Sequence, residues 1–255
     1  MIDPARPAPL SYSAVWNDAG RTLATNAGLL AAIAGVFIFL PAVLEARFFP
    51  PPEGWTSMRE WMELTQEHVS RNLPWMLLSM ILNLIGIITI YLMLLPGPRL
   101  TVGSAVGRAL AILPFYFIMQ LVVGIAWGIG FVLLIVPFLF LVGKLVLAAP
   151  ILIGETPRAP FTAIQRSWAL SSGRAWSITG LVVMVYAAAL VFSMAVRIGF
   201  GILILIALGR QGVGGLLLSI LQGLVVAVVS VVFTVLVATI YRALSPATAA
   251  AQPVR

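Results

Sequence analysis

The sequence predicts an all-α membrane protein, a polytopic bundle of about six transmembrane helices with amphipathic helices at the membrane surface. Of its 255 residues, 61% are hydrophobic and only 9% are charged, and the mean hydropathy is +1.08. A soluble domain carries about 25% charged residues, so this inventory does not supply a water-soluble surface. The apolar runs are long and do not alternate, which favours helices over barrel strands as the spanning elements.

Four apolar runs each have a length suited to one crossing, which needs about 20 residues. They are residues 27–44, 75–95, 178–196 and 216–240. Residues 109–153 are apolar for far more than one crossing, so we interpret them as two helices. The prediction is therefore six spans.

Two positions remain open for the turn inside 109–153. The turn lies near Gly124–Gly130, with Pro137 then kinking the second helix, or at Pro137 itself. Gly124 and Gly128 form a GxxxG pattern, which either packs helices or serves that turn. Residues 197–208 either extend the fifth span or lie in the membrane interface.

Arginine counts predict the orientation, because cytoplasmic loops carry an excess of positive charge. With the N-terminus inside, nine arginines fall on the cytoplasmic side and five outside. The nine are Arg6, Arg21, Arg99, Arg108, Arg158, Arg166, Arg174, Arg242 and Arg255, and the five are Arg47, Arg59, Arg71, Arg197 and Arg210. We therefore expect both termini in the cytoplasm. The preference for arginine and alanine over lysine indicates a GC-rich bacterial genome, so the membrane is expected to be the bacterial inner (plasma) membrane.

The whole chain, 1–255, is expected to form a single integral membrane domain with four polar segments. These are a cytoplasmic amphipathic segment at 1–26, a periplasmic loop with a short helix at 45–74, a cytoplasmic amphipathic loop helix at 154–176 and a flexible tail at 243–255. The N-terminus has no basic start with a cleavage site, so the first span is interpreted as a retained anchor.

Three of these segments have apolar residues at helical spacing. The faces are Val15, Ala19 and Leu23; Met58, Trp61, Met62, Thr65 and Val69; and Phe161, Ile164 and Trp168. Ser57 and Glu60 stand at capping-box spacing before the second face. Each face either lies at the headgroup boundary or packs on the protein's own spans.

Lys144 is the only lysine, in a chain with fourteen arginines, and it interrupts an apolar run. Eleven residues separate it from Glu155, which places it about 15 Å from the loop on a straight helix, near the bilayer midplane. An ionisable residue at that depth is a functional hypothesis. Three roles are open for the Lys144 side chain. It caps backbone carbonyls freed by a helix kink or snorkels to the cytoplasmic face, it contacts a lipid or another anion, or it takes part in transport. Asn83 and Gln120 are the intramembrane polar side chains available as partners.

Residues 137–176 contain a spaced set of prolines, polar residues and tryptophans: Pro137, Lys144, Pro150, Glu155, Ser167, Trp168, Leu170, Gly173 and Trp176. With these residues the segment resembles the membrane domain associated with glycerophosphoryl diester phosphodiesterases and the related YciC-like inner-membrane protein family. The resemblance implies about six helices with surface helices in the cytoplasmic loops. The chain departs from the family at Phe138, where glycine is frequent, and at Ala169 and Ser172, where basic residues are frequent.

The phosphodiesterase catalytic domain has no counterpart here, because His68 is the only histidine and no barrel-length region lies outside the membrane. The chain has no cysteine and only eight acidic residues, so we expect no metal site, no cofactor and no enzyme activity. The net charge of +7 comes from arginines at helix ends, which points to membrane orientation rather than to nucleic acid.

We therefore expect a non-enzymatic multi-pass protein that engages lipid, or another membrane protein, in envelope or lipid homeostasis. The alternative is a small transporter or channel that uses a polar site around Lys144. The candidate lipid or anion contacts are Lys144, Arg108, Arg158, Arg166, Arg174 and Trp168.

Overall fold

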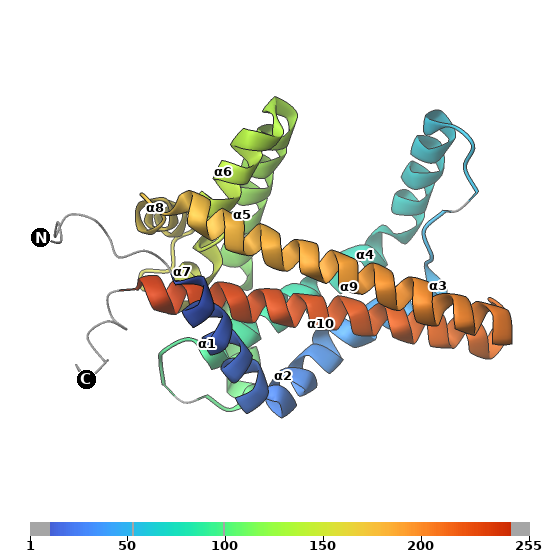
Figure 1. Ribbon diagram of the computed structural model, residues 1–255, viewed down its shortest axis with the longest axis horizontal. Helices are drawn as coiled ribbons and strands as arrows, with labels where there is room; N and C mark the ends of the chain where they lie inside the picture. The colour runs from blue at the N-terminus through green and yellow to red at the C-terminus, as the bar shows by residue number, and fades with distance from the viewer. Residues whose placement is uncertain (1–10, 53, 99, 246–255) are drawn as a thin grey trace, which may run out of the picture. The chain divides into compact units, whose positions relative to one another are not determined.

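The computed structural model describes residues 11–52, 54–98 and 100–245, and their regular secondary structure is entirely helical (Figure 1). The helices are α1 (Tyr12–Thr25), α2 (Ala27–Ala34), the π-helical turn η1 (Gly35–Phe39), α3 (Leu40–Phe48), α4 (Met58–Leu94), α5 (Val102–Leu133), α6 (Ile135–Leu145), α7 (Ala148–Gly154), α8 (Pro160–Leu170), α9 (Ala175–Leu208) and α10 (Gly212–Leu244). The predicted all-α class is confirmed.

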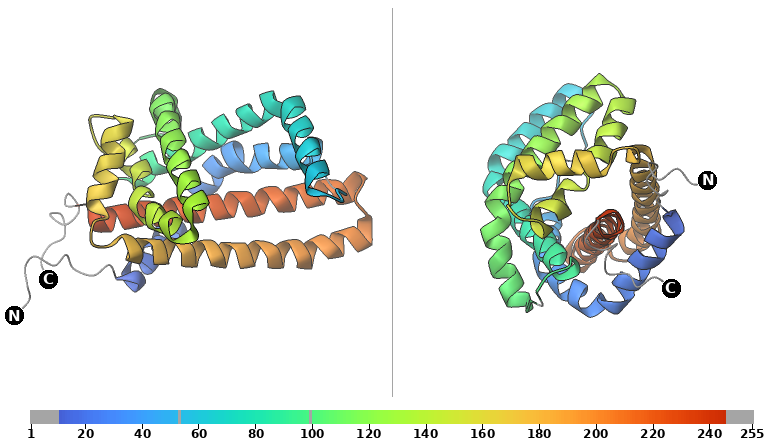
Figure 2. Two further views of the ribbon diagram at one scale, coloured as in Figure 1. Left: turned by 90° about the horizontal axis from the view of Figure 1, so that it is seen from above. Right: turned by 90° about the vertical axis from the view of Figure 1, so that its left-hand side faces the viewer.

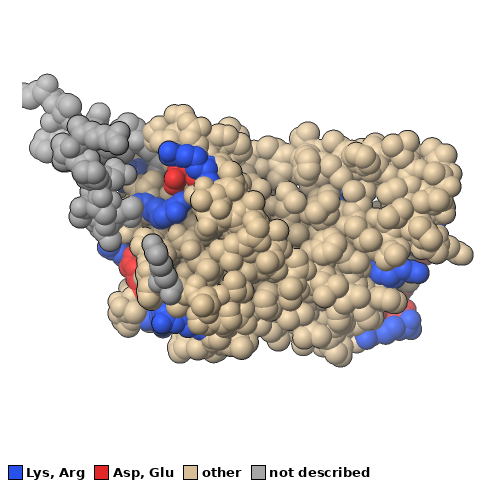
Figure 3. Space-filling model, turned by 90° about the horizontal axis from the view of Figure 1, so that it is seen from below, with Lys and Arg blue, Asp and Glu red and all other residues tan. Residues whose placement is uncertain are grey.

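Six helical segments of the described chain are long and apolar enough to cross a membrane, as the sequence predicted. They are Ala27–Phe48, Met58–Leu94, Val102–Leu133, Ile135–Gly154, Ala175–Leu208 and Gly212–Leu244. Charged side chains on the face drawn in Figure 3 gather in small groups and leave wide uncharged areas. The protein is a multi-pass membrane protein.

The described residues form two compact units, and three long helices contribute to both. The first unit contains α1, α5, α6, α7 and α8, with Ile88–Leu94 of α4, Ala175–Ala188 of α9 and Val232–Leu244 of α10. The second unit contains α2 from Gly28, η1, α3, α4 up to Ile87, the rest of α9 and α10 up to Val231.

The hairpin of α5 and α6 turns at Leu134, a single residue between the two helices (Figure 1). The prediction of a turn near Gly124–Gly130 is wrong, because α5 runs unbroken to Leu133. Leu134 has φ 165° and ψ 164°, an extended conformation that needs no glycine, and its N–H donates to the Gly130 carbonyl at 3.1 Å. The turn lies close to the alternative at Pro137, which occupies the first turn of α6.

A proline does interrupt the second helix of this hairpin, but it is Pro150 rather than Pro137. The helix breaks at Val146 and Leu147, between α6 and α7. A proline ring clashes with the carbonyl four residues earlier, which for Pro150 is that of Val146. At Pro137 the missing N–H costs little, because the first turn of a helix leaves its N–H groups without helical partners. The predicted kink at Pro137 is therefore wrong.

The tip of this hairpin is apolar on every side. Residues 131–136 are each between 62% and 85% exposed, and no charged residue occurs from Leu121 to Gly143. A tip of this composition belongs in hydrocarbon rather than in water. Because α6 has only 11 residues, it is about 16 Å long, roughly half the thickness of a bilayer core.

Two further predictions about glycines and helix length are decided. Gly124 and Gly128 lie within α5, and a Cβ at either position would meet no atom within 4 Å, so neither packing nor a turn explains the GxxxG pattern. Residues 197–208 belong to α9, which is continuous to Leu208. They extend the fifth span, as the first of the two alternatives held.

Helix α4 starts with the predicted cap and then runs much further than expected. The Glu60 N–H donates to Ser57 Oγ at 3.2 Å, and the Glu60 carboxylate accepts from the Thr56 N–H and hydroxyl. The helix expected inside the 45–74 loop continues into the second span as one 37-residue helix. Pro74 lies inside it, and α4 changes direction along its length (Figure 2).

The predicted amphipathic faces have different environments. On α1, Val15 and Ala19 are buried in the first unit, so this face packs on the protein. At the start of α4, Met58 and Met62 are 68% and 60% exposed. The first part of the 1–26 segment, most of the predicted 243–255 tail, and Arg6, Arg99 and Arg255 lie outside the described residues.

Candidate functional site: the Lys144 centre

Lys144 lies one residue before the end of α6 and is buried, with 6% of its surface exposed. The residues around it, Val142–Leu145, are all buried within the first unit. Gly143 permits this packing, because a Cβ there would collide with the Ala175 carbonyl and the Thr179 hydroxyl of α9. The lysine is therefore held where α6 meets neighbouring helices rather than facing lipid.

The ammonium group of Lys144 is taken up by α8. It donates to the Trp168 carbonyl at 3.3 Å and to Ser172 Oγ at 3.1 Å. It also lies 4.9 Å from the centroid of the Trp168 ring and 5.7 Å from that of Phe140. The Trp168 carbonyl belongs to the last turn of α8, where a positive charge is favoured by the helix dipole and by cation–π attraction.

The main chain of Lys144 accepts a hydrogen bond from the same helix, whereas its side chain donates one. Its carbonyl accepts a hydrogen bond of 2.6 Å from Ser167 Oγ, and the Ser171 hydroxyl lies 3.5 Å away. The bend at Val146 leaves this carbonyl near a helix end, where it needs a partner from elsewhere. Lys144 thus both donates to α8 and accepts from it, and α8 is fixed to α6 through this one residue.

The buried face of α8 consists of small residues and not of the predicted apolar ones. Ala163, Ser167 and Ser171 are 3%, 0% and 0% exposed and follow one another at a spacing of four. Phe161 and Trp168 are 63% and 43% exposed. Of the predicted face, Phe161 is exposed and Ile164 is half-buried, whereas the Trp168 ring lies edge-on to Phe140 of α6 at 6.0 Å. For α8, packing on the protein's own spans therefore holds for Trp168 and not for Phe161. Small side chains are favoured on this face because they allow α8 to approach the Lys144 backbone closely.

The straight-helix estimate of the depth of Lys144 does not apply to this chain. The helix is interrupted at Val146 and Leu147, so the rise of 1.5 Å per residue does not hold from Lys144 to Glu155. The loop helix α8 instead packs against α6 (Figure 2). The expected acceptors do not serve Lys144: Gln120 is exposed on α5, and Asn83 is half-buried in the second unit.

The predicted arginine contacts are not gathered around Lys144. Arg108 and Arg158 are exposed. Arg166 is also exposed, and its Nε lies 3.6 Å from a Glu155 carboxylate oxygen. Arg174 is half-buried, and its Nε has no hydrogen-bond partner. Only Trp168, among the predicted contacts, shares a hydrogen bond with Lys144.

Two polar arrangements in the first unit were not predicted from the sequence. The first is the set of serines that complete the Lys144 centre, Ser167, Ser171 and Ser172. The spacing of four between Ser167 and Ser171 could have indicated from the sequence that this face of α8 is buried. The other is Arg242, whose Nη2 donates to Asp18 Oδ2 at 3.0 Å and to Thr22 Oγ1 at 2.9 Å. That contact joins α10 to α1, which lie more than 200 residues apart in the sequence. No local sequence pattern predicts such a contact.

Among the residues that the structure describes, no group of three or more His, Asp or Glu side chains is placed to hold a metal ion. Comparisons with family models, with curated proteins and with solved structures find no match to this chain. The resemblance over residues 137–176 therefore stays a prediction. The structure does bring four of its residues, Lys144, Ser167, Trp168 and Trp176, to one place, with Phe140 centred 6.0 Å from Trp168 and 6.2 Å from Trp176.

Proposed function

We propose that this chain is a non-enzymatic inner-membrane protein that engages anionic lipid at its cytoplasmic face through α8. The observation that carries the proposal is the division of α8 into two faces. Its small residues are buried against the other helices of the first unit, while Phe161 and Trp168 are exposed near the exposed cations Arg158 and Arg166 in the sequence. Apolar rings next to arginines are the combination that suits the headgroup boundary of an anionic membrane.

The Lys144 centre supports this proposal as an anchor. By capping the end of α8, the ammonium holds this helix on α6 while Phe161 and part of the Trp168 ring stay exposed. The arginine distribution supports a cytoplasmic position for α8, since Arg158, Arg166 and Arg174 belong to the more basic side. We place this surface in envelope or lipid homeostasis as part of the same proposal.

The alternative, a transporter or channel built around Lys144, loses its main support. An intramembrane cation is attractive as a transport site when its charge faces a pathway. Here the ammonium donates to the Trp168 carbonyl of α8 and to the hydroxyl of Ser172 just after this helix, and it lies over two aromatic rings. These contacts favour a structural role for the lysine.

The proposal is tested with the full chain purified in mild detergent and titrated with phosphatidylglycerol, with bound lipid counted by native mass spectrometry. Each arginine near an anionic surface contributes about 1 kcal/mol. We expect Arg158→Gln with Arg166→Gln to weaken lipid retention about tenfold, because the Glu155 contact already offsets part of the Arg166 charge. The control is Arg59→Gln, a side chain that is 89% exposed on α4.

Equal retention by the double variant and the wild type would refute the lipid proposal. Equal loss in Arg59→Gln would show general electrostatic attraction instead of a surface on α8. If phosphatidylcholine is retained as well as phosphatidylglycerol, the arginines do not select charge, and the proposal also fails.

A further inference from the structure

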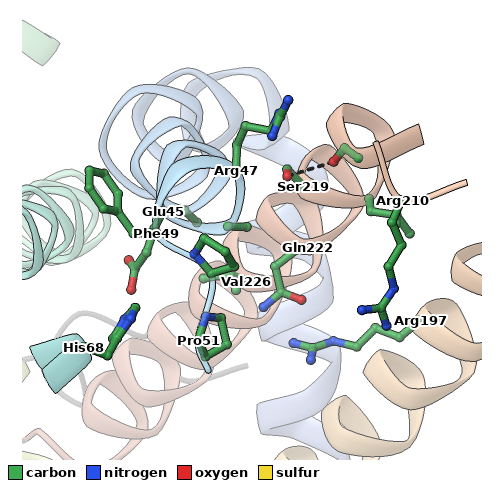
Figure 4. A pocket seen from close by; sticks show the side chains of 15 residues that line it. Glu45, Arg47, Phe49, Pro51, His68, Arg197, Arg210, Ser219, Gln222 and Val226 are labelled. Carbon is green, nitrogen blue, oxygen red and sulfur yellow. Dashed lines mark hydrogen bonds between the residues drawn. The ribbon is translucent and has the colours of Figure 1, made fainter. Parts of the chain in front are cut away.

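The second unit contains an open cavity of about 880 Å³. This lies within the range of about 300–1,000 Å³ that is usual for small-molecule sites. Its walls come from α3 and the residues that follow it, from α4, and from α9 and α10 (Figure 4). Its polar lining includes Glu45, Arg47, His68, Arg197, Arg210 and Gln222.

Arginine predominates among the charged residues that line this cavity. The lining contains three arginines and one acid, Glu45. In Figure 4, Glu45 lies next to His68, whereas the side chains of Arg197 and Arg210 extend toward one another with Gln222 beside Arg197. An anion placed between two guanidinium groups is attracted by both. Guanidinium forks match the oxygens of a phosphate in pairs, and the Gln222 amide adds a donor.

An apolar groove lies against the same cavity. It has a volume of about 420 Å³ and is lined by Val43, Leu44, Phe48, Val213 and Leu216 together with Gly212. Arg47 lines both the groove and the cavity. A ligand with a phosphate and a hydrocarbon chain would therefore meet cations in the cavity and apolar side chains beyond Arg47.

The turn between α9 and α10 shapes this region. Gly209 and Gly212 have φ of 71° and 58°, values that L side chains rarely adopt. The Gly209 N–H donates to the Leu205 carbonyl at 3.0 Å and ends α9. This tight turn brings Arg210 and Val213 to the rims of the cavity and the groove within four residues.

We propose that this cavity binds one anionic phospholipid, with its phosphate between Arg197 and Arg210 and an acyl chain in the groove lined by Phe48, Val213 and Leu216. The site uses none of the residues of α8. All three arginines belong to the segments that the sequence assigns to the outer side of the membrane. It goes beyond the proposed function, and either proposal can fail without the other.

The test uses the full chain in mild detergent with three probes: phosphatidylglycerol, glycerol 3-phosphate, which has no acyl chain, and inorganic phosphate. Binding is followed by native mass spectrometry and by calorimetry. We expect phosphatidylglycerol to bind at least tenfold more tightly than either soluble probe. Arg197→Gln should weaken phosphatidylglycerol about tenfold, because it removes charge-assisted hydrogen bonds. Arg71→Gln, 75% exposed on α4 and paired with Glu67, is the matched control.

A second variant separates the acyl chain from the phosphate. Val213→Asn places an amide in the groove and should weaken phosphatidylglycerol severalfold while leaving the binding of glycerol 3-phosphate unchanged. Arg197→Lys keeps the charge without the fork and should lose less affinity than Arg197→Gln. Partial retention in that variant also demonstrates that the protein remains folded.

Inorganic phosphate binding as tightly as phosphatidylglycerol would make this a site for free phosphate and overturn the lipid assignment. No binding of any probe, or an equal effect of Arg71→Gln, would overturn the site altogether. Loss of binding in Arg158→Gln with Arg166→Gln and not in Arg197→Gln would assign the lipid to α8 and refute the cavity.

Discussion

Lys144 and the arginine-lined cavity are two places where this apolar chain carries positive charge, and the surroundings of the charge differ between them. The Lys144 ammonium has a carbonyl, a hydroxyl and two ring faces, all from the first unit. In the second unit, Arg47 and Arg197 line an open cavity, and neither forms an ion pair with a described acid.

The difference teaches how to separate structural from ligand-directed charge in a membrane protein. A cation that is fully paired by its own chain contributes to stability, and its removal is felt in folding. A cation that faces a cavity with like-charged neighbours adds little to folding, and its removal is felt in binding. Lys144 stood out in the sequence because it interrupts an apolar run. Such a position does not by itself distinguish a structural cation from a cation that binds a ligand.

The largest expected effect is at Lys144. Lys144→Ala removes the ammonium and also the buried stem, so we expect the free energy of unfolding to fall by about 3 kcal/mol. Lys144→Met keeps most of the stem and should cost about 1 kcal/mol, because the Trp168 carbonyl keeps its bond of 2.8 Å from the Ser172 hydroxyl. Both are measured by SDS titration in mixed micelles. A Lys144→Met protein that is as stable as the wild type would remove the ammonium from the structural account.

A smaller loss of stability is expected when the hydrogen bond from the Ser167 hydroxyl to the Lys144 carbonyl is removed. Ser167→Ala leaves the Lys144 carbonyl with only the more distant Ser171 hydroxyl, which should cost about 1 kcal/mol in the same titration. Thr162→Ala is the control, since that hydroxyl is exposed on the same helix. Equal stability of the two variants would mean that the Ser167 bond does not fix α8.

The smallest effect on stability is expected in the cavity. Arg197→Gln should change the free energy of unfolding by less than about 0.5 kcal/mol, because the side chain is exposed and has no acidic partner among the described residues. Arg242→Gln, which breaks the contacts with Asp18 and Thr22, should cost about 2 kcal/mol in a parallel measurement. If Arg197→Gln proved the more damaging of the two, the contrast between paired and ligand-directed charge would be lost.

Much of the fold was predictable because hydrocarbon length and composition determine it. The six spans, the cap at Ser57 and the α1 face at Val15 follow from runs and spacings in the sequence. The turn at Leu134 was not predictable from glycine or proline, since an extended leucine between two helices carries no local signal. The bend before Pro150 was missed because the prediction assigned it to Pro137.

The candidate site was predictable only in part. Lys144 and Trp168 stand out in the sequence, and the structure joins them. Ser167 and Ser171 were passed over because a search for apolar periodicity ignores small residues, although their spacing with Ala163 marks a close-packed face. The cavity combines Arg47 with Arg197 and Arg210, which follow it by 150 residues or more, so only tertiary structure brings the first arginine to the other two.

The apolar hairpin of α5 and α6 has a consequence for how the topology of this chain can change. A hairpin returns the chain to the side from which it started, whether it reaches half or all of the way through the bilayer. The directions of α9 and α10 therefore depend on the parity of the crossings before them and not on the depth of the Leu134 turn. Insertions or deletions at this tip can lengthen or shorten the hairpin without inverting any helix that follows it.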